Sequence, residues 1–177
     1  MLSTPLNLGV IEAGDLYNYL YGFFRRDFVE QRTMLNGTIH ISPRSHLLED
    51  GKERDFWHLT SREKSFQVKE GNRYVTKKER LIDYARSERI EWVRQIIANH
   101  GQGRIKLFYY RESNADRDIR LYLWAFQDDF VVILQKLGRS TSFLVTSFYI
   151  DHDAKRIDYE NRYQRYNRGD LNGCEWF

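Results

Sequence analysis

The chain has 177 residues, of which 41% are hydrophobic, 15% aromatic and 30% charged, and its formal net charge is +3. This length and composition exclude an intrinsically disordered chain and predict one domain over residues 1–177, with a core at about 11–155 and a tyrosine- and arginine-rich segment at 156–177. The mild excess of basic residues permits contact with nucleic acid without requiring it.

Several classes of protein are excluded by features that the sequence lacks. No run approaches the roughly 20 apolar residues that cross a bilayer, and no secretory leader is recognisable, so we expect a cytoplasmic protein without membrane contact. Cys174 is the only cysteine, which excludes an intramolecular disulfide and a cysteine-rich zinc site. Glycine-rich phosphate loops, serine elbows and paired-histidine metal helices are also missing, so we expect no metal and no cofactor.

The N-terminal part alternates between helical and extended patterns. Residues from Ile11 to about Arg32 carry apolar and aromatic side chains at helical spacing, which predicts an amphipathic helix. Asn36-Gly37 breaks this pattern, and the alternation over residues 38–42 predicts a short strand. Residues 43–54 are rich in turn-forming and charged types and are expected to form a loop that leads into the central segment.

The central segment, residues 57–63, concentrates chemically capable side chains. In an extended conformation His58, Thr60 and Arg62 would lie on one face, because successive side chains of a strand point to opposite faces. A titrating imidazole, a hydroxyl and a guanidinium on one surface suit metal-free acid–base chemistry on a phosphate. The alternative is structural: His58 is an interior histidine, Thr60 a strand residue, and Arg62 and Glu63 a solvated ion pair.

A second anomaly concerns two arginines in a helix predicted over residues 77–99, with Thr76 as its N-cap. Arg86 and Arg89 fall inside the apolar stripe of this helix instead of opposite it. Three interpretations stay open. The side chains extend from the edges of the stripe to solvent, or they pair with carboxylates such as Glu63, and both of these roles are structural. Alternatively they project into a cleft and bind phosphate there.

The following part of the chain predicts an antiparallel meander. Four β-rich runs, at residues 104–111, 120–126, 130–137 and 142–150, are separated by short turn-forming connections. Short connections join antiparallel neighbours. We therefore predict an α+β fold in which N-terminal helices pack on a mainly antiparallel four- to five-stranded meander sheet. Thr146 on the last run is either a polar site residue or a β-branched strand residue with a local hydrogen bond.

The C-terminal segment mixes arginine and tyrosine from Lys155 to Arg168. Cations mixed with stacking rings suit single-stranded RNA. The alternative is a helical or irregular tail that packs its tyrosines on the domain. The sequence leaves both interpretations open.

The chain resembles the superfamily of barnase-, EndoU-, colicin D- and RelE-like nucleases, most closely its phage- and plasmid-associated branches. The resemblance covers roughly residues 35–155 and rests on the order of elements, on Phe56-Trp57-His58-Leu59-Thr60, on the helix that bears Arg86, Arg89 and Trp92, and on Val145-Thr146-Ser147-Phe148. Members of this superfamily cleave RNA on the face of an α+β sheet, and many are toxins. The second histidine and the lysine of an EndoU-type set have no evident counterpart in this chain.

The resemblance implies RNA cleavage by transesterification, in which a 2′-hydroxyl oxygen attacks the adjacent phosphorus and a cyclic phosphate forms without a metal ion. The implied catalytic residues are His58, Thr60, Arg86, Arg89 and Thr146, and the implied substrate-binding residues are Arg62, Trp92 and Tyr149. RNA is the implied partner, together with a cognate antitoxin or immunity protein. The alternative function is a catalytically inactive module of the same fold that binds RNA or protein.

Overall fold

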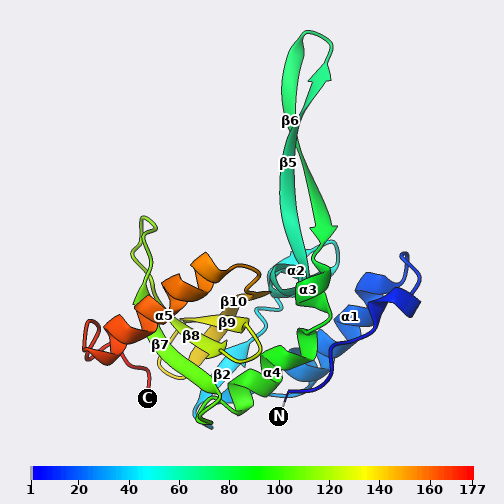
Figure 1. Cartoon of the computed structure of the whole chain (residues 1–177). Helices are drawn as coiled ribbons and strands as arrows, with labels where there is room; N and C mark the ends of the chain where they lie inside the picture. The colour runs from blue at the N-terminus through cyan, green and yellow to red at the C-terminus, as the bar shows by residue number, and fades with distance from the viewer. Residues whose placement is uncertain (1) are drawn as a thin grey trace.

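The structure is a computed structural model that describes residues 2–177, and it has an α+β architecture built on one mixed six-stranded sheet (Figure 1). The strand order is β1-β2-β10-β9-β8-β7. The strands are β1 (Met34–Leu35), β2 (Ile39–Ser42), β7 (Ile105–Arg111), β8 (Ile119–Ala125), β9 (Phe130–Lys136) and β10 (Thr141–Tyr149).

Four of these strands confirm the predicted meander. The strands β7, β8, β9 and β10 are antiparallel neighbours in chain order, and their ends lie within one residue of the predicted bounds. The sheet is larger than predicted and is not wholly antiparallel, because β2 pairs with β10 in parallel and β1 pairs with β2 beyond it. A parallel pair joins segments far apart in the chain, so no local turn signal announces it.

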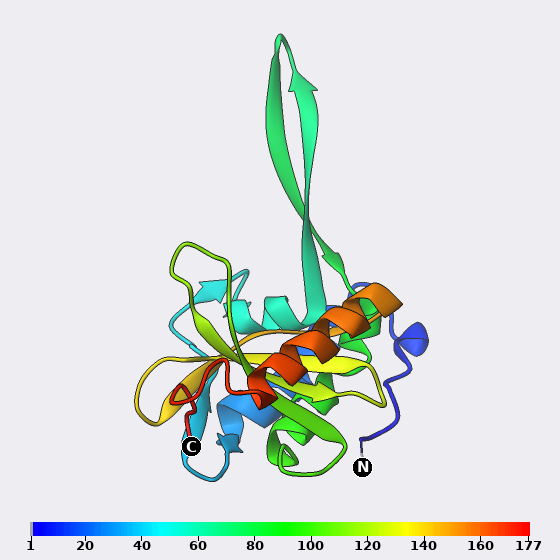
Figure 2. The ribbon, with the colours of Figure 1, turned by 60° about the vertical axis from the view of Figure 1, so that its left-hand side comes forward.

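Helices cover both faces of the sheet (Figures 1 and 2). One face packs against α1 (Leu16–Phe24), α2 (Arg54–Thr60) and α4 (Ile90–Ala98), which form the larger core with it. The other face packs against α5 (Asp153–Asn167), where Tyr159 is buried among aromatic and aliphatic side chains of the meander. The C-terminal segment therefore packs tyrosines on the domain, as one of the two sequence interpretations predicted.

Several short elements connect these layers. A 3₁₀ turn, η1 (Leu8–Val10), precedes α1, and a π-helical turn, η2 (Arg25–Glu30), continues α1, so the predicted helix over residues 11–32 is shorter and less regular than expected. Within the predicted loop, β3 (Leu48–Glu49) and β4 (Lys52–Glu53) form a tight hairpin just before α2. None of the helices in residues 2–177 has the length and apolar character needed to cross a bilayer.

The central segment begins as a helix, and the predicted extended conformation is wrong. Residues 54–60 form α2, which buries Phe56, Trp57 and Leu59 in the larger core. A helix turns by about 100° per residue, so side chains two positions apart point to nearly opposite sides, and His58 and Thr60 do not share a face. Short apolar runs are compatible with both strand and helix, and here the packing against α1 and the sheet decides.

The helix predicted over residues 77–99 is wrong in its first half. Residues 73–82 form a strand, and the helical part is divided into α3 (Tyr84–Ser87) and α4. Thr76 is not an N-cap, because it pairs across a hairpin with Gln67. The cap is Asp83, whose side chain accepts a hydrogen bond from the backbone amide of Arg86 at 3.2 Å.

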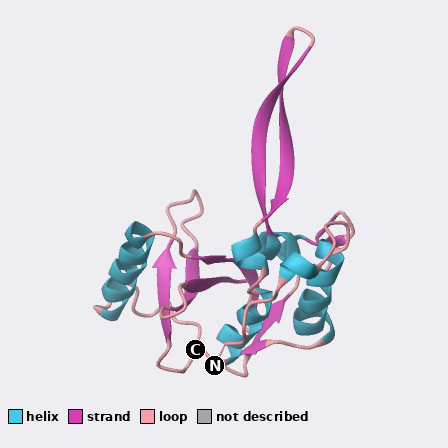
Figure 3. Cartoon of the chain, turned by 45° about the vertical axis from the view of Figure 1, so that its right-hand side comes forward, coloured by secondary structure: helices cyan, strands magenta, loops and turns pink. Residues whose placement is uncertain are grey.

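The strands β5 (Ser61–Glu70) and β6 (Arg73–Ile82) form a long antiparallel hairpin that projects from the rest of the molecule (Figures 1 and 3). The hairpin belongs to neither core: over residues 62–79 the side chains are exposed, except for the half-buried Val68. At its tip Gly71 has a φ of +62°, which glycine adopts without strain. Gly-Asn between two β-rich runs is a sequence signal for such a hairpin.

Candidate functional site

An open hollow lies at the base of the hairpin, between the hairpin strands, the end of α2 and β10. Its volume is about 490 Å³. The residues that line it are Glu49, Arg54, His58, Ser61, Glu63, Arg80, Arg86, Val145 and Thr146. Three of the predicted site residues, His58, Arg86 and Thr146, therefore meet here from separate parts of the chain.

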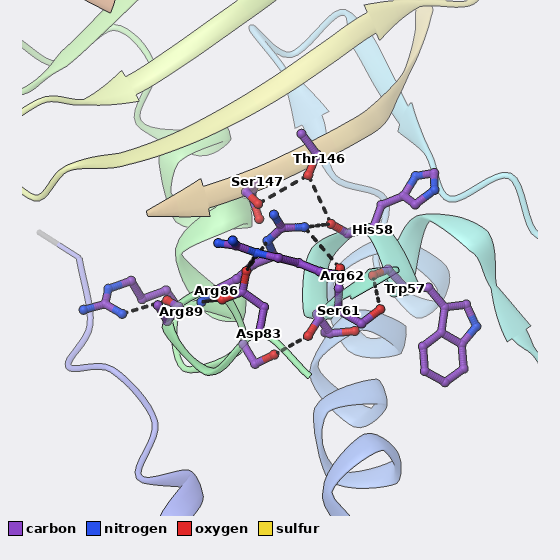
Figure 4. Close-up of polar contacts among 12 residues, drawn as sticks. Trp57, His58, Ser61, Arg62, Asp83, Arg86, Arg89, Thr146 and Ser147 are labelled. Carbon is purple, nitrogen blue, oxygen red and sulfur yellow. Dashed lines mark hydrogen bonds and ion pairs between the residues drawn. The ribbon is translucent and has the colours of Figure 1, made fainter. Parts of the chain in front are cut away.

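The backbone carbonyl of His58, in the last turn of α2, joins three elements at the hollow (Figure 4). Its oxygen accepts hydrogen bonds from Nη1 of Arg86 at 2.6 Å and from Oγ1 of Thr146 at 3.1 Å. The last carbonyls of a helix lack partners within the helix, and here α3 and β10 supply them. The imidazole ring of His58 points away from Arg86 and borders the hollow.

The surroundings of the His58 ring lower its pKa below the ordinary value of 6.5. Burial is the largest cause, because it disfavours the charged form, and the positive charge of Arg44 is the next. The carboxylate of Glu49 opposes the shift, whereas Arg80 and Arg54 reinforce it. The ring is therefore neutral at pH 7 and can accept a proton.

Two arginines that the sequence analysis did not single out give the hollow its positive charge. Nε of Arg54 and Nη2 of Arg80 both contact the carboxylate of Glu49, at 2.8 and 2.7 Å. The lining holds the three guanidinium groups of Arg54, Arg80 and Arg86 and the two carboxylates of Glu49 and Glu63, which leaves an excess of positive charge. The Arg54 and Arg80 side chains are 46% and 25% exposed, so an anion in the hollow can reach them.

The sequence contains a signal from which the position of Arg80 could have been predicted. Gly71-Asn72 is typical of a hairpin turn, and this turn sets the strand register. The register puts Arg80 opposite Glu63, the last residue of the central segment. The guanidinium of Arg80 is also held by Trp57, because its Cζ lies 5.4 Å from the centre of the indole ring.

Arg86 is largely buried, and its Nη1 serves the fold. Besides the carbonyl of His58, Nη1 contacts the carbonyl of Ser61 at 3.4 Å, and Nε lies 3.5 Å from the carboxylate of Asp83. Burial lowers the pKa of Arg86 and Asp83 opposes this shift, but a guanidinium remains charged in proteins. Within residues 2–177 neither Nη2 nor the buried Nε donates a hydrogen bond, and Arg86 is one of the residues that line the hollow.

Thr146 reaches the hollow because β10 is irregular at this point. The register with β9 shifts between Leu144 and Thr146, which makes Val145 a bulge residue. The pairing of β2 with β10 ends at Phe143, so the next part of β10 has an edge that α2 and α3 cover. The hydroxyl proton of Thr146 is committed to the carbonyl of His58, and its oxygen can still accept a hydrogen bond.

Two predicted site residues do not line the hollow, because the central segment is not extended over its whole length. Thr60 is fully buried, and its Oγ1 donates to the carbonyl of Phe56 at 2.9 Å within α2. Arg62 lies on the face of the hairpin that does not line the hollow, where its guanidinium pairs with Asp83. The predicted common face of His58, Thr60 and Arg62 therefore does not exist.

Arg89, Trp92 and Tyr149 form a separate cluster. Cζ of Arg89 lies 5.1 Å from the ring centre of Trp92 and 4.7 Å from that of Tyr149, and Arg89 points away from His58 (Figure 4). Trp92 is only 6% exposed, and its Nε1 donates to the carbonyl of Ser3 at 2.7 Å. The indole is a core group and is not exposed for stacking on a base.

A second cavity, of about 330 Å³, lies between the N-terminal segment and the end of α4. Apolar groups such as Pro5, Trp92 and Ile105 line it, with one cation, Arg104, and one carboxylate, Asp128. It gathers less charge than the hollow and no imidazole, so the hollow is a better candidate for phosphate chemistry than this cavity.

Comparisons of the chain with protein-family models, with curated proteins and with solved structures gave no match. Residues 2–177 contain no group of three or more His, Cys, Asp or Glu side chains placed to hold a metal ion. What the site can do chemically therefore has to be argued from its own groups: a neutral imidazole beside an excess of guanidinium charge, in a space open to solvent.

Proposed function

We propose that this protein is an endoribonuclease that cleaves RNA in the hollow by transesterification, without a metal ion, as its resemblance to the barnase-like superfamily implies. The observation that carries the proposal is that His58, Arg80 and Arg86 meet at one open hollow. Guanidinium groups bind phosphate bidentately, and an imidazole transfers protons near neutral pH.

In this mechanism a phosphodiester enters the hollow and competes with Glu49 for Arg54 and Arg80, while Nη2 of Arg86 reaches the same group. The 2′-oxygen loses its proton and attacks the adjacent phosphorus, the bond from phosphorus to the 5′-oxygen breaks, and the 5′-oxygen takes up a proton. The products are a 2′,3′-cyclic phosphate and a 5′-hydroxyl end. His58 is the titrating ring at the hollow and serves one of the two proton transfers.

The test is RNA cleavage by the purified protein in the presence of EDTA. We expect fragments that end in a cyclic phosphate, and we expect His58→Ala to lower the rate by about 10²-fold or more. Because the carbonyl of His58 holds α3 and β10, removal of the ring leaves these hydrogen bonds in place and the fold intact. A matched control is His152→Ala, since His152 is 66% exposed next to Asp151 and lies outside the hollow.

The proposal fails if the protein leaves RNA intact in EDTA, or if the His58→Ala variant cleaves as fast as the unmodified protein. A second readout in cells is growth arrest on expression, which His58→Ala should relieve. A cell that makes a toxic ribonuclease needs an inhibitor of it, such as a cognate antitoxin or immunity protein.

A second candidate function is RNA binding without cleavage. The observation that favours it is that Nη1 of Arg86 and the hydroxyl proton of Thr146 are both spent on the carbonyl of His58, which leaves few groups at the hollow for chemistry. Salt-sensitive RNA retention with intact RNA would identify this function, because phosphate contacts weaken steeply as the salt concentration rises.

A further inference from the structure

We propose that one face of the β5–β6 hairpin is a binding track for the backbone of a long RNA strand, and that this track leads the strand into the hollow. The proposal rests on the RNA-binding part of the proposed function and deepens it. It names the substrate as a polynucleotide that extends well beyond the hollow, in contrast to a nucleotide or a short oligonucleotide.

The hairpin concentrates the basic charge of the chain. Between Arg62 and Arg80 the sequence carries seven lysine or arginine residues and three glutamates, a net charge of +4, whereas the whole chain has a net charge of +3. The rest of the molecule is therefore slightly acidic, and the projecting hairpin is its cationic part. A cationic, solvent-exposed ribbon is complementary to a polyanion.

The register of the hairpin separates its side chains into two faces. We call the odd-numbered residues of β5 and the even-numbered residues of β6 from Glu63 to Arg80 the hollow-side face, because Glu63 and Arg80 line the hollow. From this pair at the base to Lys69 opposite Tyr74 near the tip, every residue on this face is polar, charged or tyrosine. Tyr74 is 70% exposed, so its ring is available to stack on a base.

The opposite face differs in polarity and not in net charge. It carries Phe66, Val68, Val75 and Leu81, a stripe of partly exposed apolar side chains. Each face has a net charge of +2, so charge alone does not distinguish them. Continuity with the hollow and the absence of apolar side chains select the hollow-side face for a sugar–phosphate backbone.

The length of the hairpin sets the length of RNA that it can hold. Ten residues per strand extend roughly 33 Å, a distance that about ten nucleotides cover at the ~3.4 Å rise of a duplex strand. The faces wind about the hairpin axis with the strand twist, which Figures 1 and 2 show from two sides. A bound strand would follow this winding toward the hollow.

The register also provides a matched pair of double variants. Lys69 and Tyr74 are directly opposite each other on the hollow-side face, whereas Phe66 and Lys77 are directly opposite each other on the other face. The variants Lys69→Gln/Tyr74→Ser and Phe66→Ser/Lys77→Gln each remove one cation and one aromatic ring. Both are made in the His58→Ala background, so that the RNA stays intact, and circular dichroism verifies the fold of each.

The experiment measures the binding of single-stranded RNAs of about four and about fourteen nucleotides by fluorescence anisotropy, at several salt concentrations. We expect Lys69→Gln/Tyr74→Ser to weaken binding of the longer RNA roughly tenfold, to lower its salt slope by about 0.7, and to leave the shorter RNA unaffected. We expect Phe66→Ser/Lys77→Gln to change either affinity by less than about threefold.

Any of the following results would contradict the proposal that the hollow-side face binds RNA. Equal losses from the two variants, or a loss confined to Phe66→Ser/Lys77→Gln, would mean that the hollow-side face is not the binding face. A loss that is the same for both RNAs would mean that the hairpin acts only through the hollow. If neither variant weakens binding while Arg54→Gln/Arg80→Gln abolishes it, the hollow binds RNA without the track. If the His58→Ala protein with an unaltered hairpin binds neither RNA, the proposed function fails instead.

Discussion

His58 acts through two different groups, its backbone carbonyl and its ring. The carbonyl accepts hydrogen bonds from Arg86 and Thr146 and so assembles the hollow, while the ring borders the hollow as a neutral base. This division means that ring and scaffold can be tested separately, because a substitution removes only the side chain. Sequence reasoning singled out all three residues and left both a structural and a functional role open for Arg86 and Thr146. In the structure both donate to the backbone oxygen of His58.

The residues that sequence reasoning missed are those whose position depends on long-range pairing. Arg54 and Arg80 are unremarkable surface cations in the sequence, and they reach the hollow because the short β3–β4 hairpin and the long β5–β6 hairpin bring them to Glu49. Arg89 was misplaced because the helical spacing put it beside Arg86, whereas in the structure it lies next to Trp92 and Tyr149.

The ion pair between Arg44 and Asp55 gives a prediction at the residue scale. Asp55 is fully buried at the start of α2, Nε of Arg44 lies 3.1 Å from both of its carboxylate oxygens, and Cζ of Arg44 lies 3.8 Å from the ring centre of Phe143. Burial raises the pKa of Asp55, and Arg44 opposes this shift. We expect Arg44→Ala to lower the free energy of unfolding by about 3–5 kcal/mol at neutral pH, because it leaves a buried carboxylate unpaired.

The pH dependence of this loss has a definite sign. Without Arg44 the pKa of Asp55 rises further, and a carboxyl group with a raised pKa in the folded state destabilises the fold only when the pH is high enough to ionise it. The loss should therefore shrink as the pH falls toward about 4. Urea unfolding at several pH values measures it, and adding Asp55→Asn should recover part of the stability at neutral pH. A loss below about 1 kcal/mol, or one independent of pH, contradicts the prediction.

At the scale of elements, the β5–β6 hairpin is an addition to the fold and not a part of its core. Both of its faces are exposed to solvent, and an isolated two-stranded hairpin is at best marginally stable in water. Its persistence as a long, polar and basic ribbon is more readily explained by binding than by stability. This is the structural reason for treating it as a functional arm.

Replacing residues 64–79 by a two-residue Asn-Gly turn, which keeps Glu63 and Arg80 at the hollow, tests the independence of the hairpin. We expect the free energy of unfolding to change by less than about 1 kcal/mol, because the deleted side chains lie outside both hydrophobic cores. Denaturant unfolding provides the measurement. The shortened chain should also bind long and short RNAs with similar affinity. A loss of more than about 3 kcal/mol would show that the hairpin supports the fold, contrary to this account.

The elements that the sequence predicted well are those with local signals. Each strand of the meander has either alternating polar and apolar residues or a continuous apolar run, and turn-forming residues bound it. The strands were therefore predicted within one residue of their observed ends. Within the segment from Arg54 to Ile82, residues 57–60 were misassigned as extended and residues 77–82 as helical, and the strands of the hairpin were not predicted. A short aromatic run is compatible with strand and helix alike, and a polar strand exposed on both faces lacks the alternation that identifies a strand.

At the scale of the whole molecule, the parallel pairing of β2 with β10 decides where a site can form. The pairing ends at Phe143, so the rest of β10 offers an edge that α2 and α3 cover, and the hairpin continues from the end of α2. The hollow lies at this junction, with the cationic hairpin beside it and a slightly acidic body around it. This uneven distribution of charge attracts a polyanion to the end of the molecule that carries the hairpin.

The central claim is that the hollow binds an RNA phosphate beside the ring of His58. The most direct measurement is the pKa of that ring by NMR, alone and with a short 2′-O-methyl RNA, which lacks the attacking hydroxyl. In the free protein we expect a pKa below the ordinary value of about 6.5, because burial and Arg44 disfavour the imidazolium. Bound phosphate should raise this pKa, because its negative charge favours the imidazolium. An RNA that binds without changing the pKa of His58 would contradict the account.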